Sequence, residues 1–366
     1  MLAGTAHRTI GFRLLIVLGG LALLGSLGAH LLMRRPFRTS PELVGAPPPP
    51  RADPGAGLTI RPQPGELPRT LYTRTAVTPP LTRTTNLLLA GIDTRPEFTG
   101  GRTDALVLVV LDRRSGHVGL VGIPRDLAVE LPGEGLVRIN TIYLRGTRTG
   151  TDGKPCGECG VALLQQTMLQ TFGLAVEHTL FVDHAGFEQL VDQLGGIAVN
   201  VICPIRDRFI DPRGADGRLE LRLEAGVQWL DGRTALMFSR SRHGRGIVDR
   251  ARRQQAVLVG MRDRLLQLGP HRMAELLPAL QRTVFTDMRS LDLLRLSRQL
   301  LRIRREQIHG LVLDWRHGAP TTLKDGRWVM IPRPAALHAA LSRLFEAGAP
   351  GDRRADTCKP MDAALH

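Results

Sequence analysis

Residues 86–93 read Asn-Leu-Leu-Leu-Ala-Gly-Ile-Asp, and residues 105–111 read Ala-Leu-Val-Leu-Val-Val-Leu. The second run is apolar at every position, which is typical of a strand buried on both faces of a sheet. Residues 112–116, Asp-Arg-Arg-Ser-Gly, predict a hairpin turn into a third apolar run at 117–123. These runs predict a buried sheet that contains at least one antiparallel pair.

Helical patterns alternate with further strands along the rest of the chain. Apolar spacing predicts helices over 161–172, 187–194, 232–239 and 249–268, and strands at 180–182, 197–202 and 308–313. Strands interleaved with helices predict an α/β layered fold, and the hairpin makes its central sheet mixed. Two more helical stretches after Pro270 are expected to complete the same domain, at residues 83–347.

The N-terminal part predicts a membrane anchor and a stalk. Residues 14–33 lack Asp, Glu, Lys and Arg over twenty positions, the length that a helix needs to cross a lipid bilayer. We expect an uncleaved single-pass anchor there, with residues 1–13 in the cytoplasm and the domain outside the cell membrane. Twelve of the 25 prolines fall in 36–80, so residues 34–82 are expected to form an extended stalk. Residues 348–366 are expected to be a flexible tail.

The net charge of +15 suggests an anionic partner. Only three of the 49 basic residues are lysines, and the arginines are scattered without a block of five or six. Two tyrosines and three tryptophans are too few for stacking platforms along single-stranded nucleic acid. The composition argues against nucleic-acid binding and favours anionic lipids or polyanionic polymers.

The four cysteines, Cys156, Cys159, Cys203 and Cys358, fit an oxidising compartment and allow three complete pairings. Cys156-Gly-Glu-Cys159 could also be half of a zinc site, but the sequence has no second CxxC or His pair to complete it. Disulfides and plain thiols both remain open, and so does the pairing.

The chain has no P-loop, G-x-S-x-G elbow, H-E-x-x-H or dinucleotide fingerprint. Charged residues gather instead where predicted strands end, the usual place of sites in α/β sheets. The groups are Gly-Ile-Asp-Thr-Arg (91–95), Gly-Arg-Thr-Asp (101–104), Ile-Pro-Arg-Asp (123–126) with Arg-Ile-Asn (138–140), Ser-Arg-Ser-Arg-His (239–243) and Asp-Arg-Ala-Arg-Arg-Gln (249–254).

These residue types suit a diphosphate. Arginine is permanently charged, and its planar fork matches two phosphate oxygens at once. Two carboxylates at strand ends could hold Mg²⁺, which takes one or two protein oxygens and completes its shell with phosphate and water. Each Arg–Asp pair taken alone has a simpler interpretation as a surface salt bridge, and the arginines at 250–253 as a solvated helix face. Five such groups in succession favour a binding site.

The order of these motifs resembles the LytR–CpsA–Psr (LCP) family over about residues 86–260. The resemblance is carried by the runs at 87–95, 102–109, 123–126, 138–140 and 239–243, together with Val-Asp-Gln-Leu-Gly-Gly-Ile (191–197), Leu-Asp-Gly-Arg-Thr-Ala-Leu (230–236) and Asp-Arg-Ala-Arg-Arg-Gln-Gln (249–255). It implies a three-layer α/β/α domain that encloses an apolar tunnel for a polyprenyl chain. It also implies a phosphotransferase that moves a glycopolymer from polyprenyl diphosphate to a cell-wall acceptor, usually peptidoglycan.

The resemblance assigns roles position by position. Asp93 and Asp104 would ligate Mg²⁺ or another divalent cation. The diphosphate would be bound by Arg102, Arg125, Arg138, Arg240, Arg242, Arg250 and Gln254. The sequence departs from the family pattern near the last motif, where Ile247 stands at an often acidic position and Asp249 is the nearest acid.

The sequence thus predicts a membrane-anchored phosphotransferase, with Arg102 and Arg125 stabilising the reacting phosphate. Asp126 is a candidate general base, and a salt bridge to a neighbouring arginine is its alternative role. The same site could use water as the acceptor and act as a polyprenyl-diphosphate phosphohydrolase. A non-catalytic wall-polymer-binding or regulatory protein is a third alternative.

Overall fold

The computed structural model describes residues 81, 83–93, 101–148, 156–214, 216–243, 246–268, 283–288, 302–323 and 325–347, with the single positions 272, 276, 292, 296, 299 and 358. The predicted cytoplasmic segment and anchor, nearly all of the stalk, and the tail apart from Cys358 lie outside these residues, as does Arg95. Within the described part, no helix combines the length and the apolar character that a membrane span requires.

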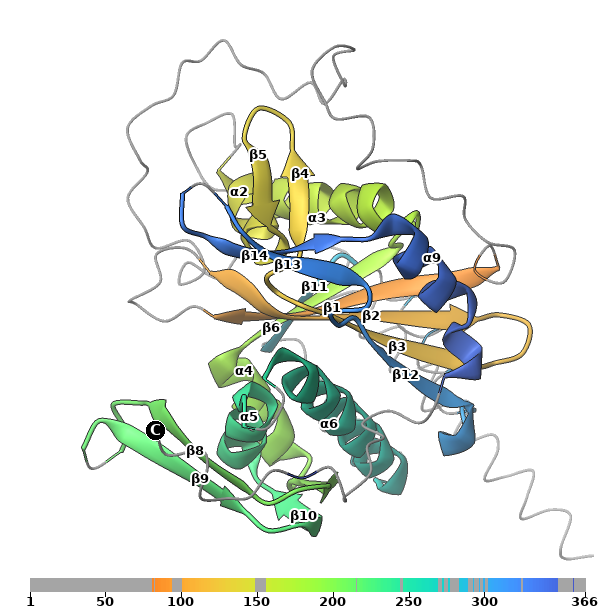
Figure 1. The fold of residues 1–366 in the computed structure, drawn as a ribbon. Coiled ribbons are helices and arrows are strands. Elements are labelled where there is room, and N and C mark those ends of the chain that lie inside the picture. Colours follow the sequence, from red (N-terminus) through yellow and green to blue (C-terminus); the bar gives the residue numbers. More distant parts are fainter. Residues whose placement is uncertain are drawn as a thin grey trace, which may run out of the picture.

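A mixed sheet of six strands, in the order β11-β6-β1-β2-β3-β12, forms the centre of the domain (Figure 1). β2 runs antiparallel to both β1 and β3, as the predicted hairpin requires, whereas β6 pairs in parallel with β1 and β12 pairs in parallel with β3. The strands are β1 (Thr84–Asp93), β2 (Arg102–Asp112), β3 (Val118–Ile123), β6 (His178–Asp183), β11 (Val284–Thr286) and β12 (Ile308–Val312).

Helices cover both faces of this sheet, which agrees with the expected three layers (Figure 1). One face carries α2 (Ile142–Thr147), α3 (Gly157–Phe172) and α9 (Pro334–Ser342). The other carries α4 (His184–Gln193), α5 (Gly232–Arg240) and α6 (Ile247–Gln267). Short 3-10 helices occur at η3 (Ile139–Thr141), η4 (Arg305–Gln307) and η5 (Leu344–Glu346). The sheet separates two clusters of buried apolar side chains, one around Leu88 and Leu108 and one around Leu87 and Val109.

Four two-stranded ribbons surround the layers. They are β4 (Ala128–Leu131) with β5 (Gly135–Arg138), β7 (Ile197–Val201) with β10 (Gly226–Leu230), β8 (Ile205–Ile210) with β9 (Arg218–Leu223), and β13 (Gly318–Thr322) with β14 (Trp328–Pro332). The β8–β9 hairpin extends from the helical layer below the sheet in Figure 1.

Capping side chains explain why two helices begin earlier than apolar spacing predicts. Asp183 accepts a hydrogen bond from the backbone N–H of Gly186, so α4 begins at residue 184 rather than 187. The Cys156 sulfur accepts from the N–H of Cys159, which starts α3 at residue 157 rather than 161. The predicted end of α3 is confirmed at Gly173, whose φ of 68° suits only glycine well.

A β-bulge interrupts the pairing of the two strands that define the sheet. Gly91 lies opposite Ala105 and Ile92 lies opposite Thr103, which leaves Asp104 without a partner in the ladder. A bulge bends the strand and re-aims the side chain of the extra residue. The carboxylate of Asp104 is therefore turned out of the regular alternation at the end of β2.

All four cysteines form disulfides, so they are neither free thiols nor half of a zinc site. Cys156 pairs with Cys159 at the start of α3, and Cys203 pairs with Cys358, 155 residues later. The second bridge fixes a point of the C-terminal tail to the segment between β7 and β8.

Candidate active site

Asp104 is the centre of a polar cluster at the end of β2. Its Oδ2 accepts from Arg125 Nη1 at 2.5 Å, and its Oδ1 accepts from Asn140 Nδ2 at 3.0 Å. Arg250 Nη2 donates to the backbone carbonyl of Asp104 at 2.9 Å. Three residues that are far apart in the sequence, from the turn after β3, from η3 and from α6, thus meet at the bulge.

Arg240, Arg242 and Arg250 come from the end of α5 and the start of α6, and they act electrostatically on one another. The pKa of Arg250 is lowered from 12.5 to about 10, chiefly by burial and also by the charges of Arg125, Arg242 and Arg240, against the opposing effect of Asp104. Burial and the charge of Arg125 likewise lower the pKa of Arg242. The fold therefore concentrates four guanidinium groups in a poorly solvated place, where they repel one another until an anion binds.

A second set of contacts holds the segment between α5 and α6 in place. Asp207 on β8 accepts from Ser241 Oγ at 2.7 Å and from the backbone N–H of Arg242 at 3.3 Å. Arg253 on α6 donates to the carbonyls of Ser241 and His243. On the side of residues 241–243, these hydrogen bonds involve only backbone atoms and the serine hydroxyl, so none of them uses the guanidinium group of Arg242.

Arg240 has a different support, because its guanidinium lies over the ring of Phe209 at 5.4 Å from the centroid. A cation over an aromatic face keeps its charge and its outward-facing donors. The other predicted residue of this region, Gln254, donates to the carbonyl of Ser239 at 3.5 Å. Its neighbour Gln255 is buried and bridges β3 and β12 through the carbonyls of Leu120 and Leu311, which is a structural role.

Asp126 is an ion-pair partner in this structure. Its carboxylate lies 3.3 Å from Arg138 Nε and 3.6 Å from Arg125 Nε. Arg138 also donates to the carbonyl of Trp328 at 2.9 Å, which directs it toward β14. Of the two roles weighed for Asp126, the geometry corresponds to the salt bridge, which it forms with both Arg125 and Arg138.

Asp93 ends β1 on the other side of the bulge and is only 4% exposed. His184 Nδ1 lies 3.8 Å from its Oδ1, because the parallel pairing of β1 with β6 brings the start of α4 to this point. Arg102 is exposed and stands opposite Asp93 in the β1–β2 ladder. Both residues are therefore at the same edge of the sheet as Asp104.

The donor groups of this edge fit an anion and a divalent cation. Nε of Arg250 is buried and has no hydrogen-bond acceptor among the described residues. Nε of Arg125 is also buried and has no hydrogen bond among them, but it lies 3.6 Å from the carboxylate of Asp126. A carboxylate has about four lone-pair positions, of which Asp104 uses two, so it can also ligate a metal. No group of three or more His, Cys, Asp or Glu gathers among the described residues. Mg²⁺ takes one or two carboxylates when phosphate and water complete its shell, and the two carboxylates at this edge are those of Asp93 and Asp104.

An apolar strip runs from this edge along β1 and β6, on the face covered by α4 and α6. Leu89 and Leu180 are paired in register and only partly buried, although both strands lie inside the sheet. At the far end of the strip is a cavity of about 520 Å³ with a mixed lining. Leu87, Met288 and Leu296 are its apolar residues, and the polar and charged ones are Thr85, Arg113, Glu177, His178, Asp292 and Gln299. Eight residues of strand separate Thr85 from Asp93, on the order of 27 Å.

Two features of the site were not predicted from the sequence. Asn140 lies in the predicted 138–140 group but was assigned no role, and its contact with Asp104 appears only once η3 has turned the chain. His184 belongs to no motif, and only the parallel β1–β6 pairing reveals its place. Asp249, set against Ile247 above, is buried in the first turn of α6 and acts electrostatically on His243.

Curated proteins have sequences similar to part of this chain. The polyisoprenyl-teichoic acid–peptidoglycan teichoic acid transferase TagU of Oceanobacillus iheyensis is 31% identical over 175 residues, 47% of this chain and 49% of that protein. The probable cell wall biosynthesis protein LcpB of Corynebacterium glutamicum is 31% identical over 186 residues, 47% of this chain and 39% of that protein. The chain therefore spans about half or less of the length of these curated relatives.

Among solved structures, Bacillus subtilis TagV is similar with a TM-score of 0.57 and 22% identity, covering 73% of this chain and 98% of TagV. A structure described as TagT bound to LIIa-WTA has a TM-score of 0.55 and 21% identity, covering 77% of this chain and 98% of TagT. These likenesses show the fold. The model of the LytR_cpsA_psr family matches residues 70–344, three quarters of the sequence, and this chain belongs to that family.

Proposed function

We propose that this protein is a phosphotransferase that moves a glycopolymer, as a sugar-phosphate, from a polyprenyl-diphosphate carrier to a cell-wall acceptor such as peptidoglycan. The relatives TagU and TagT are named polyisoprenyl-teichoic acid–peptidoglycan teichoic acid transferases. Membership of the LytR_cpsA_psr family supports the same class of reaction for this chain.

The observation that carries the proposal is the meeting of Arg125, Arg240, Arg242 and Arg250 around the bulge at Asp104. A diphosphate linked at both ends bears two negative charges, and four guanidinium groups neutralise them with donors to spare. Because burial already lowers the pKa of Arg242 and Arg250, an anion between them relieves a repulsion that the free protein must bear.

The apolar strip supports a lipid carrier rather than a free nucleotide diphosphate. It begins beside the arginines, continues along Leu89 and Leu180, and ends in the cavity at Thr85 and His178. A prenyl chain laid along the strip buries apolar surface, at about 25 cal/mol for each Å² removed from water. A sugar nucleotide has no group that would use this surface.

The reaction forms one phosphorus–oxygen bond and breaks another. An acceptor hydroxyl attacks the phosphorus that bears the sugar, and the oxygen bridging the two phosphates leaves with the prenyl phosphate. The hydroxyl proton ends on that phosphate monoester or in solvent, since a phosphate monoester has a second pKa near 6. Arg125 and Arg250 stabilise the charge that develops on the phosphate oxygens, which is the usual source of rate in phosphoryl transfer.

Asp93 and Asp104 would hold a magnesium ion against the diphosphate. Bound there, the ion would supply a Lewis acid that neutralises charge on the phosphate oxygens. Asn140 and Arg125 fix the orientation of the Asp104 carboxylate, and His184 stands beside that of Asp93.

We also propose that residues 14–33 anchor the chain in the cell membrane with the N-terminus in the cytoplasm. The domain would then work outside, at the surface where lipid-linked precursors are exposed. Two disulfides are in keeping with an oxidising compartment, because cytosolic thiols are kept reduced.

The test is a product analysis with the full chain in detergent micelles. The protein is incubated with a prenyl-diphosphate-linked sugar, Mg²⁺ and a soluble peptidoglycan fragment, and lipid and glycan products are separated by mass spectrometry. Arg250→Ala should lower turnover at least 100-fold, as for removal of a charged transition-state donor. Arg316→Ala, whose side chain is 87% exposed, is the matched control and should act as the parent protein does.

The products discriminate between the alternatives. Prenyl phosphate together with sugar-phosphate on the fragment supports transfer, whereas free sugar-phosphate identifies a phosphohydrolase. Tight binding of the donor without any turnover would replace the enzyme by a binding or regulatory protein. Chelation by EDTA should abolish turnover and Mg²⁺ should restore it; full activity in EDTA would remove the metal from the proposal.

A further inference from the structure

The β8–β9 hairpin has an outer face that is dominated by arginine. Its six outward positions alternate with inward ones that pack into the domain, and all six are exposed. Four are arginine, one is Glu220 and one is Ile210; the arginines, here called the cationic hairpin face, are Arg206, Arg208, Arg218 and Arg222.

The charge of this face is not balanced locally. Arg222 pairs with Glu220, at 2.8 Å between Nε and Oε1, and this bond is the main reason that the pKa of Glu220 is lowered. Arg208 and Arg206 lower it further, which puts them within electrostatic reach. In the described part of the chain no carboxylate forms a salt bridge with Arg206, Arg208 or Arg218. Arg206 even lies directly opposite Arg222, a pairing of like charges that destabilises a β-ladder.

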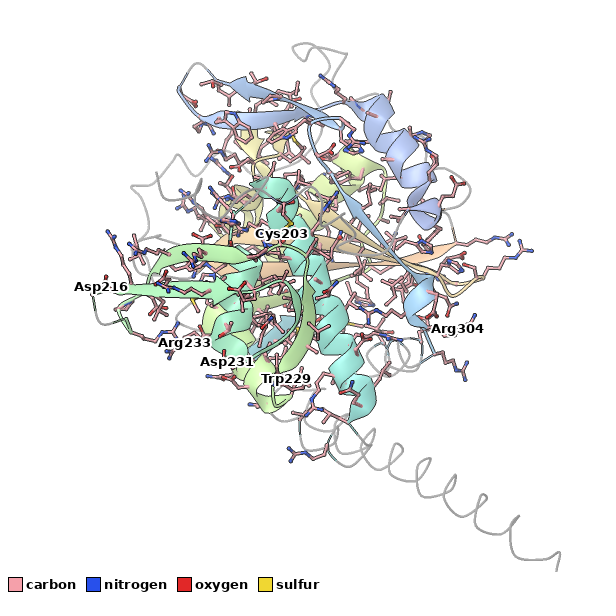
Figure 2. All side chains as sticks on the ribbon, turned by 60° about the horizontal axis from the view of Figure 1, so that its bottom comes forward. Cys203, Asp216, Trp229, Asp231, Arg233 and Arg304 are labelled. Atoms are coloured by element: carbon pink, nitrogen blue, oxygen red, sulfur yellow. A yellow bond between two sulfur atoms is a disulfide. The ribbon has the colours of Figure 1, made fainter. Side chains whose placement is uncertain are left out.

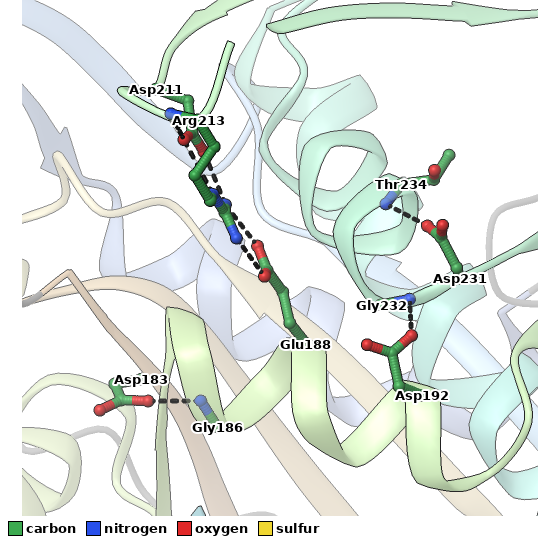
Figure 3. A network of polar contacts seen from close by, with 9 residues as sticks. All are labelled: Asp183, Gly186, Glu188, Asp192, Asp211, Arg213, Asp231, Gly232 and Thr234. Carbon is green, nitrogen blue, oxygen red and sulfur yellow. Dashed lines mark hydrogen bonds and ion pairs between the residues drawn. The ribbon is translucent and has the colours of Figure 1, made fainter.

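The hairpin is held firmly at both ends. At its base, Cys203 is bonded to Cys358, and Figure 2 shows Cys203 at the opposite end of the hairpin from Asp216. Near the tip, Arg213 forms ion pairs with Glu188 on α4 and with Asp211, each at 2.6 Å (Figure 3). The backbone that carries the outward arginines is therefore held in place at both ends of the hairpin, which lowers the cost of ordering these residues when a partner binds.

The inner face of the same hairpin supports the candidate active site. Asp207 accepts from Ser241 and from the backbone of Arg242, and Phe209 lies under Arg240. One ribbon thus connects two arginines of the diphosphate site with the cationic hairpin face.

We propose that the cationic hairpin face binds the anionic polymer portion of the substrate, a linear chain with repeating phosphodiester charges. This inference rests on the proposed function, since the site beside the hairpin would hold the diphosphate end of that chain. Successive outward arginines on one strand are about 7 Å apart and the neighbouring strand about 5 Å away, an array suited to regularly spaced charges rather than to one ion. Ile210 is the one large apolar side chain among the six positions, whereas a membrane-binding surface needs several.

The experiment measures binding without turnover. A fluorescent, short glycerol-phosphate oligomer is titrated with the full chain in detergent micelles, and anisotropy is followed as salt is raised. Arg206→Gln with Arg208→Gln is compared with Arg114→Gln plus Arg316→Gln, a control that removes the same charge from exposed sites elsewhere. If each arginine releases about 0.7 counterion, the hairpin variant should bind about 25-fold more weakly at about 0.1 M salt, and the control should not.

A lysine double variant at 206 and 208 keeps the charge and should retain most of the affinity, which separates loss of charge from loss of folding. Equal weakening in the hairpin variant and the control, or none in either, overturns the proposal. Loss of binding to phosphatidylglycerol vesicles with oligomer binding intact would overturn it in favour of a lipid surface. Oligomer binding at the hairpin in a protein that never turns over a prenyl-diphosphate donor would retain this inference and remove the proposed function.

Discussion

Arg250→Lys should make the candidate site lose affinity for a diphosphate at mildly alkaline pH. Burial, with the charges of neighbouring arginines, lowers the pKa of Arg250 from 12.5 to about 10. A difference of this size in pKa corresponds to about 3 kcal/mol against the charged form. The same surroundings acting on lysine, with an ordinary pKa of about 10.4, place it at about 8. At pH 9 about nine-tenths of the arginine side chains are charged, but only about one-tenth of the lysine side chains.

The measurement is the affinity for a soluble prenyl diphosphate, by isothermal titration calorimetry from pH 6.5 to 9.5. The parent protein should change little up to pH 9, whereas the affinity of Arg250→Lys should fall roughly tenfold between pH 7 and pH 9. The lysine also loses the planar fork, which lowers affinity equally at every pH and does not alter the shape of the curve. Arg316→Lys, on the surface, should follow the parent curve. A lysine curve parallel to that of the parent would refute the idea that the cluster disfavours charge.

Four further outcomes follow from the described contacts. Arg250→Met removes the cost of a buried charge, so the free energy of unfolding at pH 7 should rise by up to about 3 kcal/mol while diphosphate binding is lost; a lower thermal midpoint would contradict this. Asn140→Ala removes a hydrogen bond to a charged carboxylate, worth about 1.5–3 kcal/mol, and kcat/KM should fall roughly 10- to 100-fold with the fold intact by circular dichroism. At Gly160 a Cβ would lie 2.8 Å from Thr147 Cγ2 and from the carbonyl oxygen of Tyr143, both on α2, so Gly160→Ala should lower the free energy of unfolding by about 1–3 kcal/mol in a urea titration. Cys358→Ser opens a loop of 155 residues and should cost up to about 5 kcal/mol, against about 2 for Cys156→Ser, when both are measured by urea titration.

Much of the fold could be predicted from the sequence because its decisive runs are long and apolar. The run at 105–111 has one interpretation, a central strand, and the turn at 112–116 fixes the direction of its neighbour. The bulge could not be predicted, since it depends on the alignment of two strands rather than on either alone. Helix starts were also misplaced, because Asp183 and Cys156 cap α4 and α3 through side-chain contacts that apolar spacing does not register.

The sequence predicted which residues gather at the candidate site, but not which of them contact one another. Motif positions named Arg125, Arg250 and Asp104, and the fold brings these three together. The sequence placed Arg138 equally among the diphosphate ligands, whereas the structure turns it toward Asp126 and the β14 backbone. Such distinctions depend on which strand end each residue reaches in space, and the order of motifs along a chain does not contain that information.

The disulfide between Cys203 and Cys358 can form only after Cys358 has been synthesised, so it forms late in the folding of the chain. After Cys203 leaves the ribosome, another 155 residues must be made before its partner exists. At 5–20 residues per second this takes roughly 8 to 30 seconds. Cys156 and Cys159 appear earlier, and closing their short ring first removes them as competitors for the waiting thiol. The hairpin base is thus sealed only after Cys358 has been made, and a chain truncated before Cys358 would leave the Cys203 thiol unpaired and open to pairing with another molecule.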